Sequence, residues 1–160
     1  MNADAVFQAA AGQGHDWIAA RIPHQGRMCL LDRVERVGAS DAVCSAVSHA
    51  AIDNPMRHGD RLGAACGIEY AAQAMALHGA LVAQARGVPP ATMGFLVSVR
   101  SVKLHVRRLD DAGDRISVQV TNEADNGDHS IYSFALSAAG RPLLDGRAVV
   151  MLDVAPSLAP

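Results

Sequence analysis

The 160-residue sequence is poor in aromatic side chains, which make up only 4% of it, and it has no excess of basic residues. Its 14 Lys and Arg residues stand against 16 Asp and Glu residues, giving a formal net charge of −2. General nucleic-acid binders carry a basic excess or a basic face, and single-stranded bases stack on aromatic side chains. The composition therefore argues against a nucleic-acid partner.

Cysteine and long apolar runs are also scarce. The three cysteines, Cys29, Cys44 and Cys66, form no CxxC pair and leave one thiol over under any pairing, which fits a reducing compartment better than a disulfide framework. No apolar run reaches the 18 residues that a membrane span needs, and residues 1–20 show no basic segment before an apolar stretch. We expect a cytoplasmic protein without a membrane segment.

What the chain does have is the length and composition of one globular domain. Half of its residues are hydrophobic and 19% are charged, which is enough apolar surface for one core. We find no internal repeat and expect a single domain over residues 1–160. Residues 1–20 are predicted to form a helical extension of one or two short pieces.

The pattern of apolar residues predicts one long helix among several strands. The helix is expected from about Arg61 to Arg86, with Asp60 as its N-cap and Gly87 with two prolines as its stop. Period-two alternation predicts strands near residues 30–37, 42–47, 95–107, 116–120, 130–137 and 143–152. Such a helix and sheet bury each other only if the sheet curls around the helix, so we expect an α+β fold.

Two local signals refine the strand prediction. The alternation changes phase across Arg100-Ser101, which indicates a β-bulge or a sharp bend. The run Asp125-Asn126-Gly127-Asp128 is typical of a hairpin turn. The last strands are therefore expected to form an antiparallel meander.

Two polar residues interrupt the alanine-rich part of the predicted helix. Glu69 and Gln73 are four residues apart, so they project from one helix face. A buried carboxylate is costly unless it is paired or used, and desolvation would raise its pKa toward the range of a general acid. The alternative is a glutamate on the solvent side of the helix.

The small residues at the predicted helix start have two readings. Gly63, Ala64, Ala65 and Gly67 leave backbone N–H groups uncovered at the positive end of the helix dipole, where they can hold a carbonyl oxygen. Close packing of the helix against a strand explains the same residues equally well.

Two segments resemble the hotdog-fold 3-hydroxyacyl-acyl carrier protein (ACP) dehydratases. Residues 20–34 contain Ile-Pro-His and then Leu-Leu-Asp-Arg-Val, similar to the opening of that family. Residues 67–74, Gly-Ile-Glu-Tyr-Ala-Ala-Gln-Ala, resemble its central-helix motif. The resemblance covers about residues 18–152, is greatest to predicted dehydratases of aryl-polyene-type pathways, and implies a curled antiparallel sheet wrapped around one central helix.

The resemblance implies a mechanism and a set of site residues. In these enzymes a histidine deprotonates the carbon next to the thioester, and a carboxylic acid on the helix helps the 3-hydroxyl leave as water. Glu69 corresponds to the acid and Gln73 to its orienting partner, while Gly67, with Cys66 before it, lies at the turn that binds the thioester carbonyl. The product is a trans-2-enoyl thioester, the partner is an ACP with a 4′-phosphopantetheine-linked acyl group, and no metal or organic cofactor is required.

The base is where the sequence departs from the family pattern. We predict His58, eleven residues before Glu69, although Gly59 follows it where the family has an apolar residue and Pro. Asn54-Pro55 lies nearer the expected distance, but Asn cannot act as a general base. We expect His58 to face Glu69 of a neighbouring protomer. The alternatives are His24 and His49.

Three functions remain open at this point: a 3-hydroxyacyl-ACP dehydratase, a hotdog thioesterase in which Glu69 activates water, and a non-catalytic partner subunit of a heteromeric dehydratase. Exposed sheet edges predict at least a dimer, with itself or with a hotdog paralogue. A set of basic residues would suit an acidic carrier protein, although a solvated face explains it as well. These residues are Arg100, Lys103, His105, Arg107 and Arg108.

Overall fold

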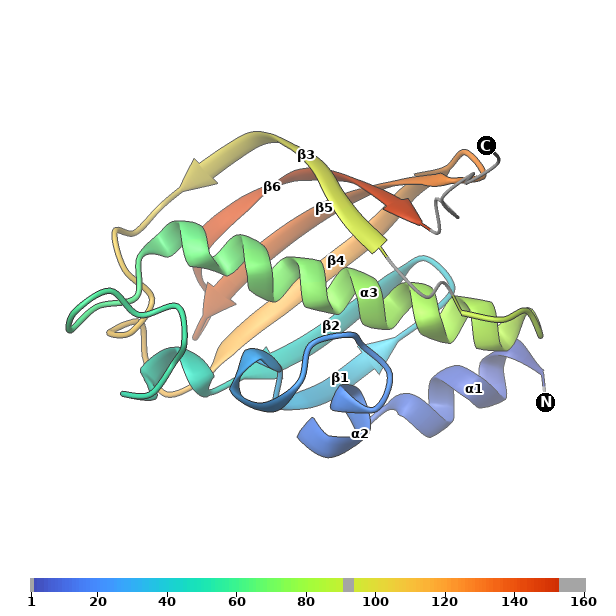
Figure 1. The fold of residues 1–160 in the computed structure, drawn as a ribbon, viewed down its shortest axis with the longest axis horizontal. Helices are drawn as coiled ribbons and strands as arrows, with labels where there is room; N and C mark the ends of the chain where they lie inside the picture. The colour runs from blue at the N-terminus through green and yellow to red at the C-terminus, as the bar shows by residue number, and fades with distance from the viewer. Residues whose placement is uncertain (1, 91–93, 153–160) are drawn as a thin grey trace, which may run out of the picture.

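The computed structural model, which describes residues 2–90 and 94–152, is one antiparallel sheet curled around a long helix (Figure 1). The six strands are ordered β1-β2-β4-β5-β6-β3 across the sheet. The expected α+β hotdog architecture is confirmed. No helix in the described ranges is both long and apolar enough to span a membrane.

The elements follow the predicted order. The helices are α1 (Ala3–Ala10), α2 (His15–Ala19) and α3 (Gly67–Ala85), with the short 3-10 helices η1 (Gly26–Met28), η2 (Ser48–Ala50) and η3 (Ala64–Cys66). The strands are β1 (Arg33–Val37), β2 (Asp41–Ala46), β3 (Gly94–Leu104), β4 (Ile116–Asp125), β5 (His129–Ala138) and β6 (Arg141–Leu152). The helical extension expected within residues 1–20, of one or two short pieces, consists of α1 and α2.

Both local signals in the strands are confirmed. The register of β3 against β6 shifts between Arg100 and Lys103, and Ser101 between them has a φ of 54°, so the bulge lies where the alternation changes phase. The β4–β5 hairpin closes through an Asn126 N–H that donates to His129 O at 2.8 Å. Gly127 in this turn has a φ of 77°, which glycine adopts without strain.

The central helix begins six residues later than predicted. We expected a start at Arg61 with Asp60 as the N-cap, but α3 begins at Gly67 and its N-cap residue, Cys66, makes no side-chain capping bond. Its 19 residues span about 28 Å.

Residues 62–64 stay outside the helix because their backbone pairs with a distant segment. The Leu62 N–H donates to Asp110 Oδ1 at 2.8 Å, and the Ala64 N–H donates to Arg107 O at 3.1 Å. Buried backbone groups need one set of partners, and here the partners come from the chain beyond β3. The periodicity of apolar residues cannot predict such a long-range pairing.

The small residues of α3 let the sheet approach the helix closely. Ala71 and Ala74 are fully buried against the core. A Cβ added at Gly67 would lie 2.5 Å from Leu144 Cδ2 on β6, far inside van der Waals contact. The packing interpretation of this glycine is therefore supported by the structure.

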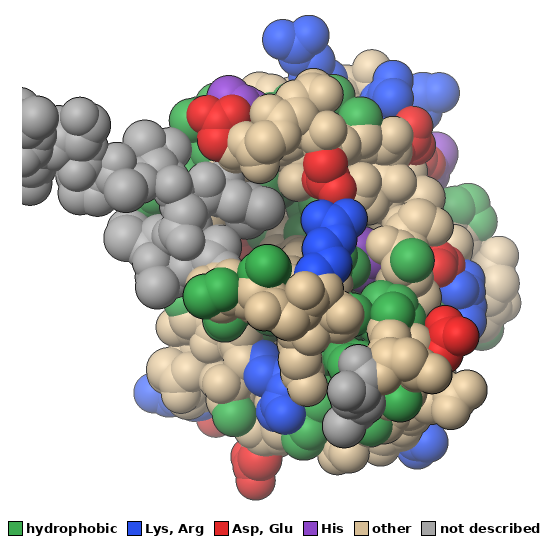
Figure 2. Space-filling view, turned by 90° about the vertical axis from the view of Figure 1, so that its right-hand side faces the viewer, with side chains coloured by type: hydrophobic (Ala, Val, Ile, Leu, Met, Phe, Trp, Pro, Cys, Tyr) green, Lys and Arg blue, Asp and Glu red, His purple; other side chains and the backbone are tan. Residues whose placement is uncertain are grey.

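Strand β3 stands at one edge of the sheet, paired with β6 on one side. Among the described residues it has no strand on its other side, and Phe95, Val97 and Leu104 are 48%, 53% and 51% exposed. Figure 2 looks onto the end of the molecule where α3 ends; acidic and basic side chains are interspersed there, with hydrophobic side chains exposed between them. This end therefore shows no large field of one charge.

Candidate active site

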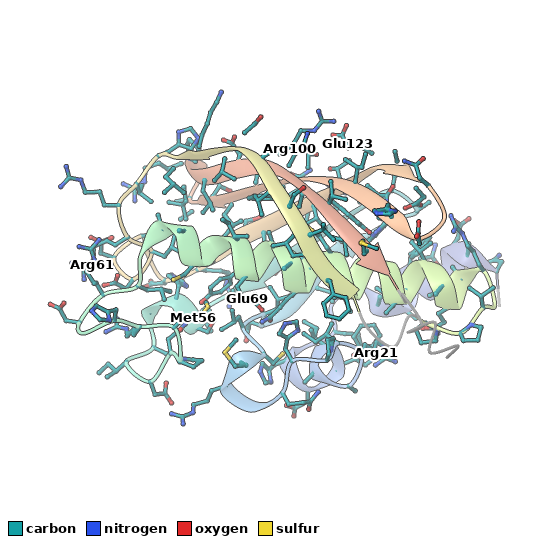
Figure 3. The ribbon with its side chains drawn as sticks, turned by 45° about the horizontal axis from the view of Figure 1, so that its top comes forward. Arg21, Met56, Arg61, Glu69, Arg100 and Glu123 are labelled. Carbon is teal, nitrogen blue, oxygen red and sulfur yellow. The ribbon has the colours of Figure 1, made fainter. Side chains whose placement is uncertain are left out.

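Glu69 meets a histidine within its own chain. It lies in the first turn of α3, and its Oε1 is 2.9 Å from Nε2 of His24, which lies between α2 and η1. The side chains are 32% and 26% exposed, respectively, so the pair is partly shielded from water but reachable. Figure 3 shows Glu69 on the side of α3 that faces the N-terminal segment.

The ionisation of Glu69 differs from what its position on the helix predicted. The hydrogen bond with His24 lowers the pKa of Glu69, with a smaller contribution from Gln73, and together they outweigh the burial that would raise it. The expected rise was wrong because the sequence did not show the partner. The resting side chain is a carboxylate.

Gln73 holds both Glu69 and the segment that carries His24. Its Nε2 donates to Met28 O at 2.6 Å and to Glu69 Oε1 at 3.3 Å, and its Oε1 accepts from the Leu30 N–H at 2.9 Å. The side chain is fully buried. These bonds fix the orientation of its amide and give Gln73 the geometry of an orienting partner.

The segment before η1 is shaped by its own residues. Gln25 Nε2 donates to Ala19 O at 2.8 Å and to Ile22 O at 3.3 Å, which folds the chain back on the end of α2. Gly26, with a φ of 60°, then turns the chain into η1. Buried Leu30 and Leu31 anchor the far end in the core. His24 is thus presented from a turn held at both ends.

A cavity of about 560 Å³ begins at the His24–Glu69 pair and follows α3 as far as Arg86. Its wall is largely apolar, with several polar or charged side chains. The apolar part includes Pro23, Ala72, Met75, Ala76, Leu96 and Val150, and the polar part includes Arg21, Asn122, Asp125 and Ser130. A cavity of this size and lining suits the apolar part of a small-molecule substrate.

His58, the predicted base, lies on the surface in this chain. Its residue is exposed, and its N–H donates to Arg61 O at 3.0 Å. Figure 3 shows Arg61 at the far tip of the molecule, away from Glu69. The predicted partnership was with Glu69 of a second protomer, so it stays a prediction, while within one chain His24 is the histidine at Glu69.

The other candidates near the helix have structural contacts. Buried Asn54 donates from Nδ2 to Ser48 O at 2.9 Å, and fully buried His49 has its Nε2 2.6 Å from Gly113 O. Neither residue bonds to Glu69. Both tie the loop before α3 to its surroundings.

The helix start shows more backbone pairing than expected. The N–H groups of Cys66 and Gly67 donate to Gly63 O and Ala64 O, respectively. The Ala64 N–H donates to Arg107 O. The half-buried Cys66 thiol lies 4.0 Å from Met56 O. The role of Cys66 and Gly67 toward a thioester stays a prediction.

The basic set of residues 100–108 is mainly a solvated face. Arg100, Lys103 and Arg107 are exposed. His105 Nε2 lies 2.7 Å from Asp145 Oδ2, and Arg108 Nε donates to both carboxylate oxygens of Asp110. No cluster of three potential metal-ligating His, Cys, Asp or Glu side chains occurs within residues 2–90 and 94–152.

Distance along the chain favours His58 over His24 as the partner of Glu69, and this distance is misleading here. His24 lies 45 positions from Glu69, and only the turn through η1 brings the two together. The signal that could have found it is the Ile-Pro-His segment itself. A polar His between Pro23 and a buried Leu30-Leu31 pair needs a partner near the core.

A family model described as "ApeP-like: ApeP dehydratase" matches residues 17–156 of this chain. No curated protein sequence matches it.

Solved structures share the fold. The dehydratase heterocomplex ApeI:P from Xenorhabdus doucetiae has a TM-score of 0.76 and 22% identity, covering 85% of this chain and 90% of that one. The Escherichia coli PaaI protein has a TM-score of 0.55 and 12% identity over 86% and 88% of the two chains. A hypothetical thioesterase with coenzyme A from Streptococcus pneumoniae has a TM-score of 0.52 and 10% identity over 76% and 84%.

Proposed function

We propose that this chain, which belongs to the ApeP-like dehydratase family, converts 3-hydroxyacyl thioesters to trans-2-enoyl thioesters. The observation that carries the proposal is the 2.9 Å contact between His24 and Glu69 in the wall of a largely apolar cavity. Dehydration needs one group to accept a proton and a second to donate one a few ångströms away. A histidine and a carboxyl group in contact meet that requirement.

The proton count of the reaction matches a pair that holds one shared proton. Neutral His24 accepts the C2 proton at Nε2, because Nδ1 is buried, while Glu69 gives a proton to the 3-hydroxyl. The C2–H and C3–O bonds break, the C2=C3 double bond forms, and water leaves. The proton on His24 then returns to Glu69 across their contact, and the pair is reset without net proton exchange.

The reaction needs a protonated Glu69, and substrate binding favours that form. In the free protein the hydrogen bond with His24 lowers the pKa of Glu69, so this side chain is a carboxylate at rest. An acyl group in the cavity displaces water, and an ion pair loses more solvation than a neutral pair. Covering the pair with substrate therefore favours its neutral form, in which the Glu69 carboxyl group carries the proton and can act as the acid while His24 acts as the base.

The acyl carrier is proposed to be an ACP. The acyl group would lie along the apolar wall of the cavity, with its thioester near Gly67 and Cys66 at the start of α3. Exposed Arg100, Lys103 and Arg107 would attract the acidic carrier and raise its association rate.

We also propose that the chain works as a dimer, either with itself or with a hotdog paralogue. The apolar edge of β3, which pairs only with β6 among the described residues, supports this, and the similar protein from Xenorhabdus doucetiae is described as a dehydratase heterocomplex. A partner could bring its own His58 toward Glu69, or supply the catalytic groups itself.

A thioesterase is the second candidate, and one observation favours it. Glu69 is a carboxylate at rest, which is the form that activates water as a general base. A similar fold is described as a hypothetical thioesterase with coenzyme A.

The deciding experiment incubates the purified chain with 3-hydroxyacyl-ACP, alone and with a candidate hotdog paralogue. Mass spectrometry of the carrier separates the functions: loss of water indicates a dehydratase, and release of the free thiol indicates a thioesterase. Activity of the mixture that survives Glu69→Gln in this chain would assign it to a non-catalytic partner role. No change in the carrier under any condition would refute the proposed function.

A further inference from the structure

A chain of buried and partly buried hydrogen bonds connects the loop before α3 to the segment after His24. Asn54 Nδ2 lies 3.1 Å from the Tyr70 hydroxyl, which lies 2.8 Å from Ser48 Oγ, which lies 2.7 Å from Leu30 O. Tyr70 is fully buried and Asn54 is 6% exposed. Three elements, η2, the loop before α3 and α3 itself, thus meet at one backbone carbonyl.

The direction of this relay follows from its ends. Leu30 O can only accept, so the Ser48 hydroxyl donates to it, and the Tyr70 hydroxyl must donate to Ser48 Oγ. The Tyr70 oxygen then accepts from Asn54 Nδ2. The Asn54 amide is oriented by the Met56 N–H, which donates to its Oδ1 at 2.9 Å. Every hydroxyl in the relay has one donor and one acceptor partner, so the loss of one member breaks the whole path.

The relay and Gln73 both form hydrogen bonds to the backbone of residues 28–30. Gln73 binds Met28 O and the Leu30 N–H, and Ser48 binds Leu30 O. Gln73 also donates to Glu69. Met28 O and the Leu30 N–H are therefore bound directly to α3 through Gln73, and Leu30 O is connected to α3 through Ser48 and Tyr70.

We propose that Tyr70 and Ser48 are positioning residues that set the distance between His24 and Glu69. The proposal rests on the proposed function, since it assigns these residues to the same pair. Neither hydroxyl bonds to His24 or Glu69; both act through the backbone at Leu30. Without the relay, this stretch keeps its bonds to Gln73, the 3.0 Å contact between Cys29 O and His15 Nε2, and its buried Leu30 and Leu31 side chains. It loses the bond that orients Leu30 O, and the turn with His24 gains freedom to move away from the carboxylate.

The test compares Tyr70→Phe and Ser48→Ala with Ser45→Ala as a matched control. Ser45 is buried, whereas Ser48 is half-buried; its hydroxyl likewise donates a hydrogen bond, to Glu35 Oε1 at 2.8 Å, but it makes no bond to Leu30. Misplacing a catalytic group slightly lowers turnover by about 10- to 100-fold, so both relay variants should lose kcat by that factor with KM unchanged. The double variant should lose no more than either single one, because both remove the same path. Ser45→Ala should keep wild-type kcat.

A second readout does not depend on activity. Because the hydrogen bond from His24 lowers the pKa of Glu69, loosening that bond should raise the pKa toward its ordinary value. NMR titration of the Glu69 carboxyl carbon should show this rise in Tyr70→Phe and Ser48→Ala but not in Ser45→Ala. An unchanged Glu69 titration in Tyr70→Phe, or the same rise in Ser45→Ala, would overturn the positioning proposal. Failure of the wild-type protein to dehydrate any substrate would refute the proposed function instead and leave this titration to decide on its own.

Discussion

The two loops that flank the first half of α3 each carry a histidine, and they use it in opposite ways. The segment before η1 places His24 2.9 Å from Glu69, whereas the loop before α3 leaves His58 exposed. That second loop instead turns Asn54 inward, where it bonds to Ser48 O and the Tyr70 hydroxyl.

The difference shows that distance along the chain is a poor guide to which histidine reaches a carboxylate. His58 is closer to Glu69 in sequence, but its loop is held by backbone pairing at Arg61 and by the inward Asn54. His24 is distant in sequence, and Gln73 fastens its segment directly to α3. Side chains that satisfy buried backbone groups decide which loop faces the carboxylate.

Removal of the carboxyl group should have the largest effect. Glu69→Gln keeps the shape of the side chain but removes the proton donor, so dehydration should fall by about 10²- to 10⁴-fold in a folded protein. Enoyl-thioester formation under saturating substrate measures this effect. Glu35→Gln, which removes a carboxyl group on β1 away from the cavity, is the control and should retain activity.

The comparison of the two loops is tested by His24→Gln against His58→Gln. We expect a loss of about 10²- to 10⁴-fold for His24→Gln and wild-type rates for His58→Gln. Because His24 and Glu69 act as a unit, the double variant His24→Gln/Glu69→Gln should be no slower than the worse single variant. The opposite ranking would move the base to His58 of a second protomer.

The two loops should also differ in what they contribute to stability. Asn54→Ala leaves the Tyr70 hydroxyl and the Met56 N–H short of a buried partner, which should lower the free energy of unfolding by about 1–3 kcal/mol. His58→Ala, at an exposed position, should change it by less than about 0.5 kcal/mol. Urea denaturation followed by circular dichroism measures both. Equal losses would mean that the inward Asn54 does not hold its loop.

Much of the fold follows from period-two alternation and turn chemistry, including the bulge at Ser101 and the hairpin at Gly127. These features depend on neighbouring residues, so a local pattern contains them. The first residue of α3 was not predictable from a local pattern, because the Leu62 N–H bonds to Asp110, which is far along the chain. Glu69 and Gln73 were identified from spacing and resemblance, and the structure supplies their contacts.

The site's electrostatics were the least predictable part. The pKa of Glu69 depends on a balance between burial, which raises it, and the hydrogen bond from His24, which lowers it by more. Helical spacing shows that Glu69 lies in an apolar stretch, so the sequence predicts the effect of burial. It does not predict the hydrogen bond, because His24 lies more than forty residues away and reaches Glu69 only in the folded chain.

The smallest expected effect is the contribution of the His24–Glu69 contact to stability at acidic pH. The folded-state pKa of Glu69 lies below its ordinary value, so its stabilisation is fully present above the unfolded-state pKa and is lost as the pH falls through the folded-state pKa. Glu69→Gln has no such group to protonate. The difference in free energy of unfolding between wild type and Glu69→Gln should therefore be greater at pH 7 than at pH 3, as measured by urea denaturation at both values. The same comparison in a His24→Gln background should show a smaller change with pH, because the main cause of the lowered pKa is then gone. A gap that widens toward pH 3 would mean that burial, rather than His24, controls this carboxyl group.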